Sequence, residues 1–303
     1  MIISQTGQIA DGFYVLGHPA IPVFLLDGEQ PTIIDAGFSF LGHLYAREIS
    51  KVLGNRHPAR CLLTHSHFDH CGSVSTLAAY FPDMQVMASE RARDILVRPH
   101  AISLIHELNQ VARSTAQYID AAAEDLPEFS PFGIDCIIKE GDILNVSSGR
   151  TIQVLETPGH TRDSLSYYIP EIKALLCAES CGIMDSTGHI FSECLVDYDQ
   201  YLASIHKLSL LNVDIACQAH WFVFTGQDAV DFVSRSQTSC DEFRDWVEHL
   251  LSEENGDISR VMARIKTVEY DGKTDHVQPE PAYLLNLEAR IKAVGRRKGF
   301  IFQ

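Results

Sequence analysis

The chain has 303 residues, 46% of them hydrophobic, which suits one large or two small globular domains with a sizeable core. Against 24 basic residues stand 40 acidic ones, giving a net charge of −16. This balance argues against nucleic acid as the main partner, because phosphate binding needs a basic surface. A small-molecule substrate remains compatible with it.

Localisation is predicted from the absence of targeting signals and from cysteine usage. The first residues, MIISQTGQIADGF, contain neither a basic n-region nor a long apolar core, so we expect no signal peptide. No apolar run is long enough to cross a bilayer, so we expect no membrane partner. Eight cysteines are scattered without a CxxC pair, which favours reduced thiols and a cytoplasmic location.

The predicted elements of the first third alternate between strands and helices. Short apolar runs punctuated by Gly and Pro predict strands, and longer amphipathic stretches predict helices. In chain order these are strands at 12–17, 21–28 and 31–37, a helix at 42–53, a strand at 60–64, a helix at 73–80 and a strand at 84–89. This layout predicts an α/β fold.

The rest of the chain adds a helical insertion and a helical end. Apolar residues at helical spacing predict one or two helices within 89–125, from Ala101 through Ala112 to Ala116 and Ile119. Strands follow at 135–144, 150–157, 163–170, 173–180 and 213–220, with a helix at 197–211 between the last two. Beyond Gln227 the pattern is helical, with breaks near 257 and 280. We therefore predict a domain at 1–225 with the insertion, and a C-terminal helical extension at 226–303 packed on it.

A dense polar cluster follows the strand at 60–64, in the stretch LLTHSHFDHCGS. His65, His67, Asp69 and His70 form an H-x-H-x-D-H motif. Imidazole and carboxylate groups at this spacing suit a divalent transition metal, zinc foremost, with iron or manganese also possible. The alternative is a solvated polar loop, which predicts no further ligand residues in similar settings.

Three further residues of ligand type stand at the ends of predicted strands. His160 follows IQVLE, Glu179 ends LLCAES and His220 ends IACQAH. A carboxylate at the end of an apolar run is unusual unless it is paired or bound to a metal. The repeated placement favours the metal site over the solvated loop.

The ordered set of motifs resembles the metallo-β-lactamase superfamily. H-x-H-x-D-H, then Gly-His-Thr at 159–161, an acid after a strand and a final histidine occur in the order typical of that family, and IIDAG at 33–37 matches another of its strand-end motifs. The resemblance covers about residues 10 to 222. It implies a four-layer αββα sandwich with the metals at the edge between the two sheets.

The resemblance also implies a role for each ligand. His65, His67 and His160 would hold a first metal. Asp69, His70 and His220 would hold a second. Glu179 would take the place of the bridging carboxylate, where the family usually has Asp, and the longer side chain could bridge with a shifted backbone or bind one metal only. Two metals are favoured because the other six ligands are present.

Two divalent ions a few ångströms apart can lower the pKa of a shared water towards about 7 and polarise a carbonyl or phosphoryl oxygen. The predicted function is therefore metal-dependent hydrolysis, in which Asp69 could accept a proton or orient the attacking hydroxide. Asp35 is either a partner of a ligand histidine or a strand-end turn acid. Phe68, Trp221 and Ser180 neighbour the ligands and are candidate substrate-pocket residues.

A closer resemblance limits the range of expected substrates. IPVFLL, THSHFDHCG, MQVMASERA and YLASIHKLSLL resemble the PqsE-like group of quinolone-signal thioesterases. This implies a thioester or a similar activated carbonyl ester, with helices capping the site. Alternatives are a regulatory protein of that group acting through partners, a lactonase or phosphodiesterase, and a glyoxalase II-like hydrolase, for which the basic end at 296–298 could bind glutathione. A homodimer through the helical extension is also possible.

Overall fold

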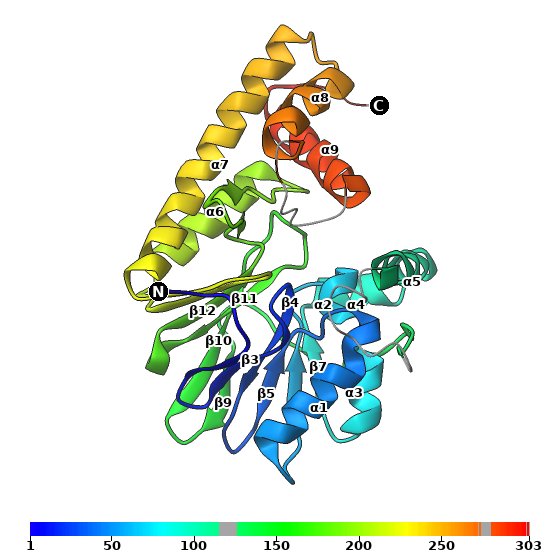
Figure 1. Cartoon of the computed structure of the whole chain (residues 1–303), viewed down its shortest axis with the longest axis vertical. Helices are drawn as coiled ribbons and strands as arrows, with labels where there is room; N and C mark the ends of the chain where they lie inside the picture. The colour runs from blue at the N-terminus through cyan, green and yellow to red at the C-terminus, as the bar shows by residue number, and fades with distance from the viewer. Residues whose placement is uncertain (115–125, 272, 274–279, 301, 303) are drawn as a thin grey trace.

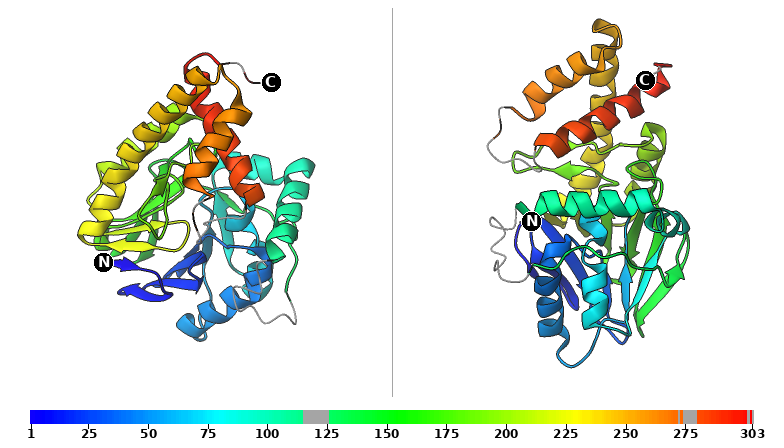
Figure 2. Two further views of the ribbon diagram at one scale, coloured as in Figure 1. Left: turned by 45° about the horizontal axis from the view of Figure 1, so that its top comes forward. Right: turned by 90° about the vertical axis from the view of Figure 1, so that its right-hand side faces the viewer.

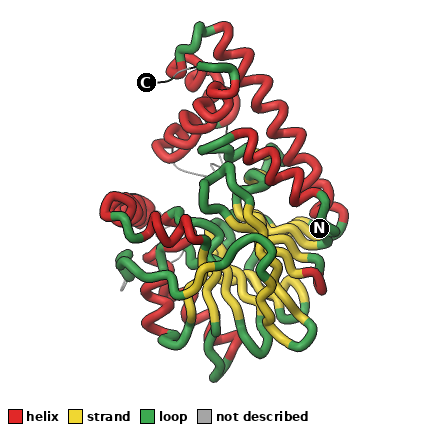
Figure 3. Tube along the Cα trace, turned by 180° about the vertical axis from the view of Figure 1, so that it is seen from behind, coloured by secondary structure: helices red, strands yellow, loops and turns green. Residues whose placement is uncertain are grey.

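Two seven-stranded β-sheets lie face to face at the centre of the structure (Figure 1), a computed structural model that describes residues 1–114, 126–271, 273, 280–300 and 302. The strand order is β2-β3-β4-β5-β6-β7-β8 in the first sheet and β1-β16-β15-β12-β11-β10-β9 in the second. Seen from behind, the strands form one block with the helices outside it (Figure 3).

The first sheet is built from the N-terminal part of the chain, and its strands have the following bounds. They are β2 (Gly7–Ala10), β3 (Phe13–His18), β4 (Ile21–Leu26), β5 (Thr32–Ile34), β6 (Arg60–Leu62), β7 (Gln85–Ala88) and β8 (Cys136–Ile137). Strands β5 to β8 pair in parallel, while β2 to β5 form an antiparallel meander. The carboxyl ends of β5, β6 and β7 therefore meet at one edge.

The second sheet combines the first strand of the chain with strands from residues 143–225. Its strands are β1 (Ile2–Ile3), β9 (Ile143–Ser147), β10 (Arg150–Glu156), β11 (Leu165–Ile169), β12 (Ala174–Ala178), β15 (Ile215–Gln218) and β16 (Val223–Thr225). Strands β12 and β15 pair in parallel, so their carboxyl ends also meet at one edge. A separate hairpin, β13 (Ile183–Met184) with β14 (Ile190–Phe191), follows β12.

Helices cover the outer face of each sheet and complete four layers. On the first sheet lie α1 (Gly42–Leu53), α3 (Val74–Tyr80), α4 (Glu90–Leu96) and α5 (Pro99–Ala112), with the one-turn α2 (Phe68–Cys71) at the sheet edge. On the second lie α6 (Tyr198–Ser209) and the first half of α7 (Gln227–Glu253). The predicted αββα sandwich is therefore the fold of the chain. The helices predicted at 115–125 fall outside the described residues.

The hydrophobic pattern of β4 explains why the sheets stack. Val23 and Leu25 face the core shared with the helices, whereas Phe24 and Leu26 face the core between the two sheets. Successive side chains of a strand point to opposite faces, so a strand covered on both sides is apolar throughout. The run IPVFLL is accordingly buried along its whole length.

The C-terminal helices form a further layer beyond the sandwich. Helix α7 starts on the second sheet and runs past it, and α8 (Ile258–Glu269) and α9 (Glu280–Arg297) pack against its far half (Figures 1 and 2). Their core contains a buried ion pair, in which Arg290 donates from both Nη atoms to Glu269 at 3.1 and 2.9 Å. Among the described residues, none of the helices combines the length and apolar character needed to span a membrane.

Replacing Arg290 with Met should destabilise the protein by about 3–5 kcal/mol, because the buried charge of Glu269 then loses its guanidinium partner and keeps only the Tyr283 hydroxyl and, at 3.8 Å, His189. Adding Glu269→Gln should restore part of the loss, since a buried amide costs less than a buried carboxylate. The matched control is Arg297→Met on the same helix. Arg297 pairs with Asp199 in a more exposed setting, so this change should cost less than about 1 kcal/mol in urea unfolding. Equal losses for the two arginines would contradict this account.

Candidate metal centre

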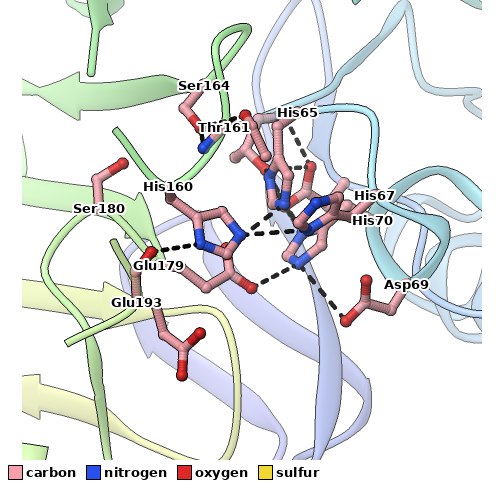
Figure 4. A network of polar contacts seen from close by, with 12 residues as sticks. His65, His67, Asp69, His70, His160, Thr161, Ser164, Glu179, Ser180 and Glu193 are labelled. Atoms are coloured by element: carbon pink, nitrogen blue, oxygen red, sulfur yellow. Dashed lines mark hydrogen bonds and ion pairs between the residues drawn. The ribbon is translucent and has the colours of Figure 1, made fainter. Parts of the chain in front are cut away.

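Seven ligand-type side chains converge from loops that follow four strands. His65 and His67 come directly after β6, and Asp69 and His70 lie in the single turn of α2. His160, Glu179 and His220 follow β10, β12 and β15 respectively. Figure 4 shows the side chains contributed by both sheets meeting at one point. The convergence follows from the topology, which brings these strand ends to the edge between the sheets.

The ligand atoms form two groups. His65, His67 and His160 offer nitrogen atoms that lie within 4.8 Å of one another. The donor atoms of the second group lie within the same limit; its members are Asp69, His70, Glu179 and His220. All seven residues expected from the sequence are thus brought together, in the same division that the family resemblance implies.

The carboxylate of Glu179 stands between the two groups. Its Oε1 lies 2.9 Å from His70 Nε2 and 3.4 Å from His220 Nε2. Its Oε2 lies 3.7 Å from His65 Nε2 and 3.9 Å from His160 Nε2. One oxygen therefore faces each group, and the extra methylene of Glu relative to Asp does not prevent this placement.

Hydrogen bonds to the histidine rings determine which ring nitrogen faces the centre. Nδ1 of His160 donates to the carbonyl of Glu193, Nδ1 of His220 to the carbonyl of Ala20 and Nδ1 of His70 to Asp35, each at 2.8 Å. In a neutral ring the other nitrogen, Nε2, then carries a lone pair. Lone pairs facing carboxylate oxygens repel unless a proton or a cation lies between them.

Two buried atoms of the centre have no hydrogen-bond partner among the described residues. They are Nε2 of His65 and Oε2 of Glu179, the atoms that face each other at 3.7 Å. Buried polar atoms are rarely left unsatisfied. Imidazole nitrogen and carboxylate oxygen are ligands of divalent transition metals, so the residues present fit such ions.

The electrostatics differ between the two groups. Although burial opposes it, the carboxylates of Glu179 and Asp35 raise the pKa of His70 well above its usual value. Burial instead lowers the pKa of His65 well below its usual value and that of His160 to about 4. Burial would raise the pKa of Glu179, but the surrounding histidines outweigh it and hold that pKa well below the ordinary value.

Asp35 is placed as a partner of a ligand histidine. Its Oδ2 contacts His70 Nδ1 at 2.8 Å, and its Oδ1 accepts from the backbone N–H of Thr64 at 2.8 Å. Asp35 also has a positive φ of 60°, a conformation that costs energy in a non-glycine residue. The carboxylate thus fixes which nitrogen of His70 faces the centre.

Tyr201 on α6 also holds the segments of the metal centre in place, which the sequence did not reveal. Its hydroxyl donates to the carbonyl of Glu179 at 2.9 Å and accepts from the backbone N–H of Glu193 at 3.1 Å. Glu193 in turn supplies the carbonyl that holds His160. Gly159 permits the approach of α6, because a Cβ there would lie 2.3 Å from Tyr201 Cα. In the sequence, Tyr201 is indistinguishable from a core residue on an apolar helix face.

The three predicted pocket residues have different surroundings. Trp221 is 37% exposed and has a φ of 66°. Its backbone N–H donates to the carbonyl of Pro19 at 2.6 Å. Phe68 is half-buried and stacks on Phe38. Ser180 is buried, and its hydroxyl contacts Thr157 Oγ1 at 3.0 Å. A place for Ser180 in a substrate pocket stays a prediction.

Comparison with protein families identifies the class. The model of the metallo-beta-lactamase superfamily matches residues 18–180, more than half of the chain, a span that includes every ligand-type residue except His220. The chain therefore belongs to the metallo-beta-lactamase superfamily.

Individual relatives are distant and longer. A lactamase-like protein of Emericella nidulans, aptB, is 27% identical over 195 residues, or 64% of this chain and 48% of that protein. A hydroxyacylglutathione hydrolase of Hamiltonella defensa is 27% identical over 169 residues, 55% and 50% of the two chains. An atrochrysone carboxyl ACP thioesterase of Aspergillus fumigatus is 22% identical over 196 residues, 64% and 48%. The chain spans about half the length of the curated relatives it matches.

Solved structures share the fold over most of the chain. A metallo-beta-lactamase family protein of Thermus thermophilus has a TM-score of 0.65 at 16% identity, covering 96% of this chain and 95% of that one. An archaeal superfamily protein of Sulfolobus tokodaii has a TM-score of 0.60 at 15% identity, covering 94% and 98%. At these identities the likeness concerns the fold alone.

Asp35→Asn should weaken metal binding by about 10–100-fold, the usual effect of removing a partner that orients a ligand histidine. The control is Asp27→Asn. Asp27 also follows a strand of the first sheet, but it pairs with Arg56 on the surface and should leave affinity unchanged. Competition with a chromophoric zinc chelator measures both variants. Equal affinities for Asp35→Asn and the parent chain would contradict the assigned role.

Metal uptake by the group containing His70 should weaken as pH falls. The raised pKa of His70 means that a proton must leave before its Nε2 can bind, so affinity should fall about tenfold per pH unit below that pKa. The low pKa values of His65 and His160 predict a weaker dependence for the other group. Stepwise zinc titration between about pH 8 and pH 6 tests this, and identical pH slopes for both binding steps would contradict it.

Proposed function

We propose that the chain is a dinuclear metal-dependent hydrolase that cleaves a thioester or a similarly activated carbonyl ester. The observation that carries the proposal is the position of Glu179, one carboxylate oxygen facing each ligand group. Two divalent ions held there would polarise the carbonyl oxygen of a substrate and lower the pKa of a water molecule. Zinc fits the nitrogen-rich ligand set, and iron and manganese share the same ligands.

The ligands divide between the two ions as the geometry suggests. His65, His67 and His160 would hold one ion. Asp69, His70 and His220 would hold the other. The Nε2 atoms of His70, His160 and His220 face inward because each Nδ1 is committed to a fixed acceptor, so little reorganisation is needed on binding.

Asp69 is proposed to handle the proton of the attacking water. Its side chain is 17% exposed, compared with 7% for Glu179, and its Oδ2 lies 3.6 Å from His220 Nε2. In the balanced reaction the water oxygen bonds to the acyl carbon while the carbon–sulfur bond breaks. Asp69 takes one proton from the water and passes it to the leaving thiolate, while the second proton of the water stays with the product acid. A carboxylate open to the substrate side can perform this transfer.

Substrate class is supported by the surroundings and by the relatives. Trp221 and Phe68 flank the ligands and offer apolar surface to an acyl group. Among the relatives, the names thioesterase and hydroxyacylglutathione hydrolase both describe hydrolysis of an acyl compound. The net charge of −16 disfavours a polyanionic phosphodiester.

Hydrolysis of an acylglutathione is the second candidate, because several relatives carry that name. Two of the three basic side chains at 296–298 are already paired within the chain. Arg297 pairs with Asp199 and Glu248, and Lys298 also pairs with Glu248. These charges are balanced on the protein surface.

His65→Ala should lower kcat/KM for an aryl thioester by about a hundredfold or more, since it removes a ligand that no neighbour replaces. His249→Ala is the control, because His249 is exposed and pairs only with Glu253 on the same helix. Both variants are assayed on a panel of an aryl thioester, a hydroxyacylglutathione, a lactone and a phosphodiester, with and without a chelator. Unchanged thioester turnover in His65→Ala would contradict the proposal, and a preference for the lactone or the phosphodiester would overturn the substrate class.

A further inference from the structure

A cavity lies among the C-terminal helices, and none of the seven ligand-type residues lines it. It has a volume of about 260 Å³ and is lined by β14 and the residues on either side of it, by α7, by the last residue of α8 and by the middle of α9. Residues that line it include His189, Ser192, Phe243, Trp246, Glu269 and Arg290. This volume is just below the 300–1,000 Å³ of drug-sized sites, so it suits a ligand of about one ring and one polar group.

Arg290 presents an unused hydrogen-bond donor in this cavity. Its two Nη atoms are occupied by Glu269, but its Nε is buried and has no partner among the described residues. The guanidinium carries five N–H donors, and the edge formed by Nε and one Nη suits a second acceptor. Buried polar atoms are normally satisfied. Oε2 of Glu193 and Oγ of Ser192 are likewise buried without a hydrogen-bond partner among the described residues, so this region has unused donor and acceptor capacity for a ligand.

The charges of the cavity select a neutral acceptor. Arg290 is already matched by Glu269, whose pKa is lowered to about 2. Glu242 at the exposed rim adds a further acidic group. An anionic ligand would be repelled by these acids, and a cationic one would face the guanidinium.

The walls favour an aromatic body. The guanidinium carbon of Arg290 lies 4.1 Å from the centre of the Phe243 ring, a cation–π contact that fixes its plane. Trp246 and Ile190 add apolar surface on the lining, and Trp246 is half-buried. A flat ring can pack against these side chains while its polar substituent reaches Arg290.

We propose that this cavity binds a small uncharged aromatic ligand that bears a carbonyl oxygen, which accepts the hydrogen bond of Arg290 Nε. The hydroxyl of Ser192, buried beside the Cys240 thiol, can donate to the same oxygen or accept from an amide. The inference does not depend on the metal centre or on the proposed hydrolysis.

The test uses the two tryptophans of the chain as separate reporters. Trp246 lines the cavity, whereas Trp221 follows a ligand residue of the metal centre. Full-length protein labelled with 5-fluorotryptophan gives one fluorine resonance for each, assigned with W221F and W246F. Benzamide, benzoate and benzylamine are titrated as matched neutral, anionic and cationic probes.

Benzamide should shift the Trp246 resonance saturably, with a Kd of about a millimolar for a ligand of this size. Benzoate and benzylamine should bind at least about tenfold more weakly. The folded double variant R290M/E269Q should lose benzamide binding, while R297M keeps it. The proposal is overturned if benzamide leaves Trp246 unmoved, shifts only Trp221, binds no better than the charged probes, or binds the double variant equally well.

Discussion

The structure of the metal centre depends on the close approach of histidine Nε2 atoms to the buried carboxylate of Glu179. Nε2 atoms of several histidines converge on the two oxygens of Glu179, and each Nδ1 is already committed elsewhere. Without a cation these groups can be reconciled only by protonation. Although burial opposes it, the carboxylates of Glu179 and Asp35 raise the pKa of His70, whereas burial lowers the pKa of His65 and of His160. Much of the architecture around them serves to hold this arrangement, which is unfavourable by itself.

The supports come from parts of the chain that are distant in sequence. Asp35 fixes His70 from within the first sheet, and the carbonyl of Ala20 fixes His220 from the turn between β3 and β4. Tyr201 ties the segments of Glu179 and Glu193 together from α6. Helix α6 packs in the same core as α7 and α9, so the C-terminal helices brace the layer that carries these contacts.

Much of the site could be predicted from the sequence because its ligands follow short, largely buried strands. The apolar runs ALLCA and IACQ are followed by Glu179 and, two residues on, by His220, and that change of character marks both the strand end and the ligand. Two-residue strands such as β1 and β13 carry too few residues for a hydrophobic period to show. The support from Tyr201 was also missed, because a helix face reveals that a residue is buried but not which backbone groups its hydroxyl contacts.

Ser180 illustrates the same limit. Its proximity to Glu179 along the chain suggested that Ser180 lies at the pocket. In the structure the hairpin β13–β14 follows closely, and the Ser180 hydroxyl contacts Thr157 Oγ1. Direction along a loop depends on backbone angles, and Ala178 just before it has a φ of 46°. Neither the backbone angles nor the direction of a side chain on a loop can be read from residue types. The ligand set can, because few other residues coordinate a metal.

The central proposal is that the seven side chains would hold two divalent ions, with one carboxylate oxygen of Glu179 facing each ligand group. Anomalous diffraction from crystals of the metal-loaded protein tests it most directly. The account predicts two peaks on either side of the Glu179 carboxylate, one beside His65, His67 and His160, the other beside Asp69, His70 and His220. Ion density absent from both positions, or a single ion bound without Glu179, would contradict it.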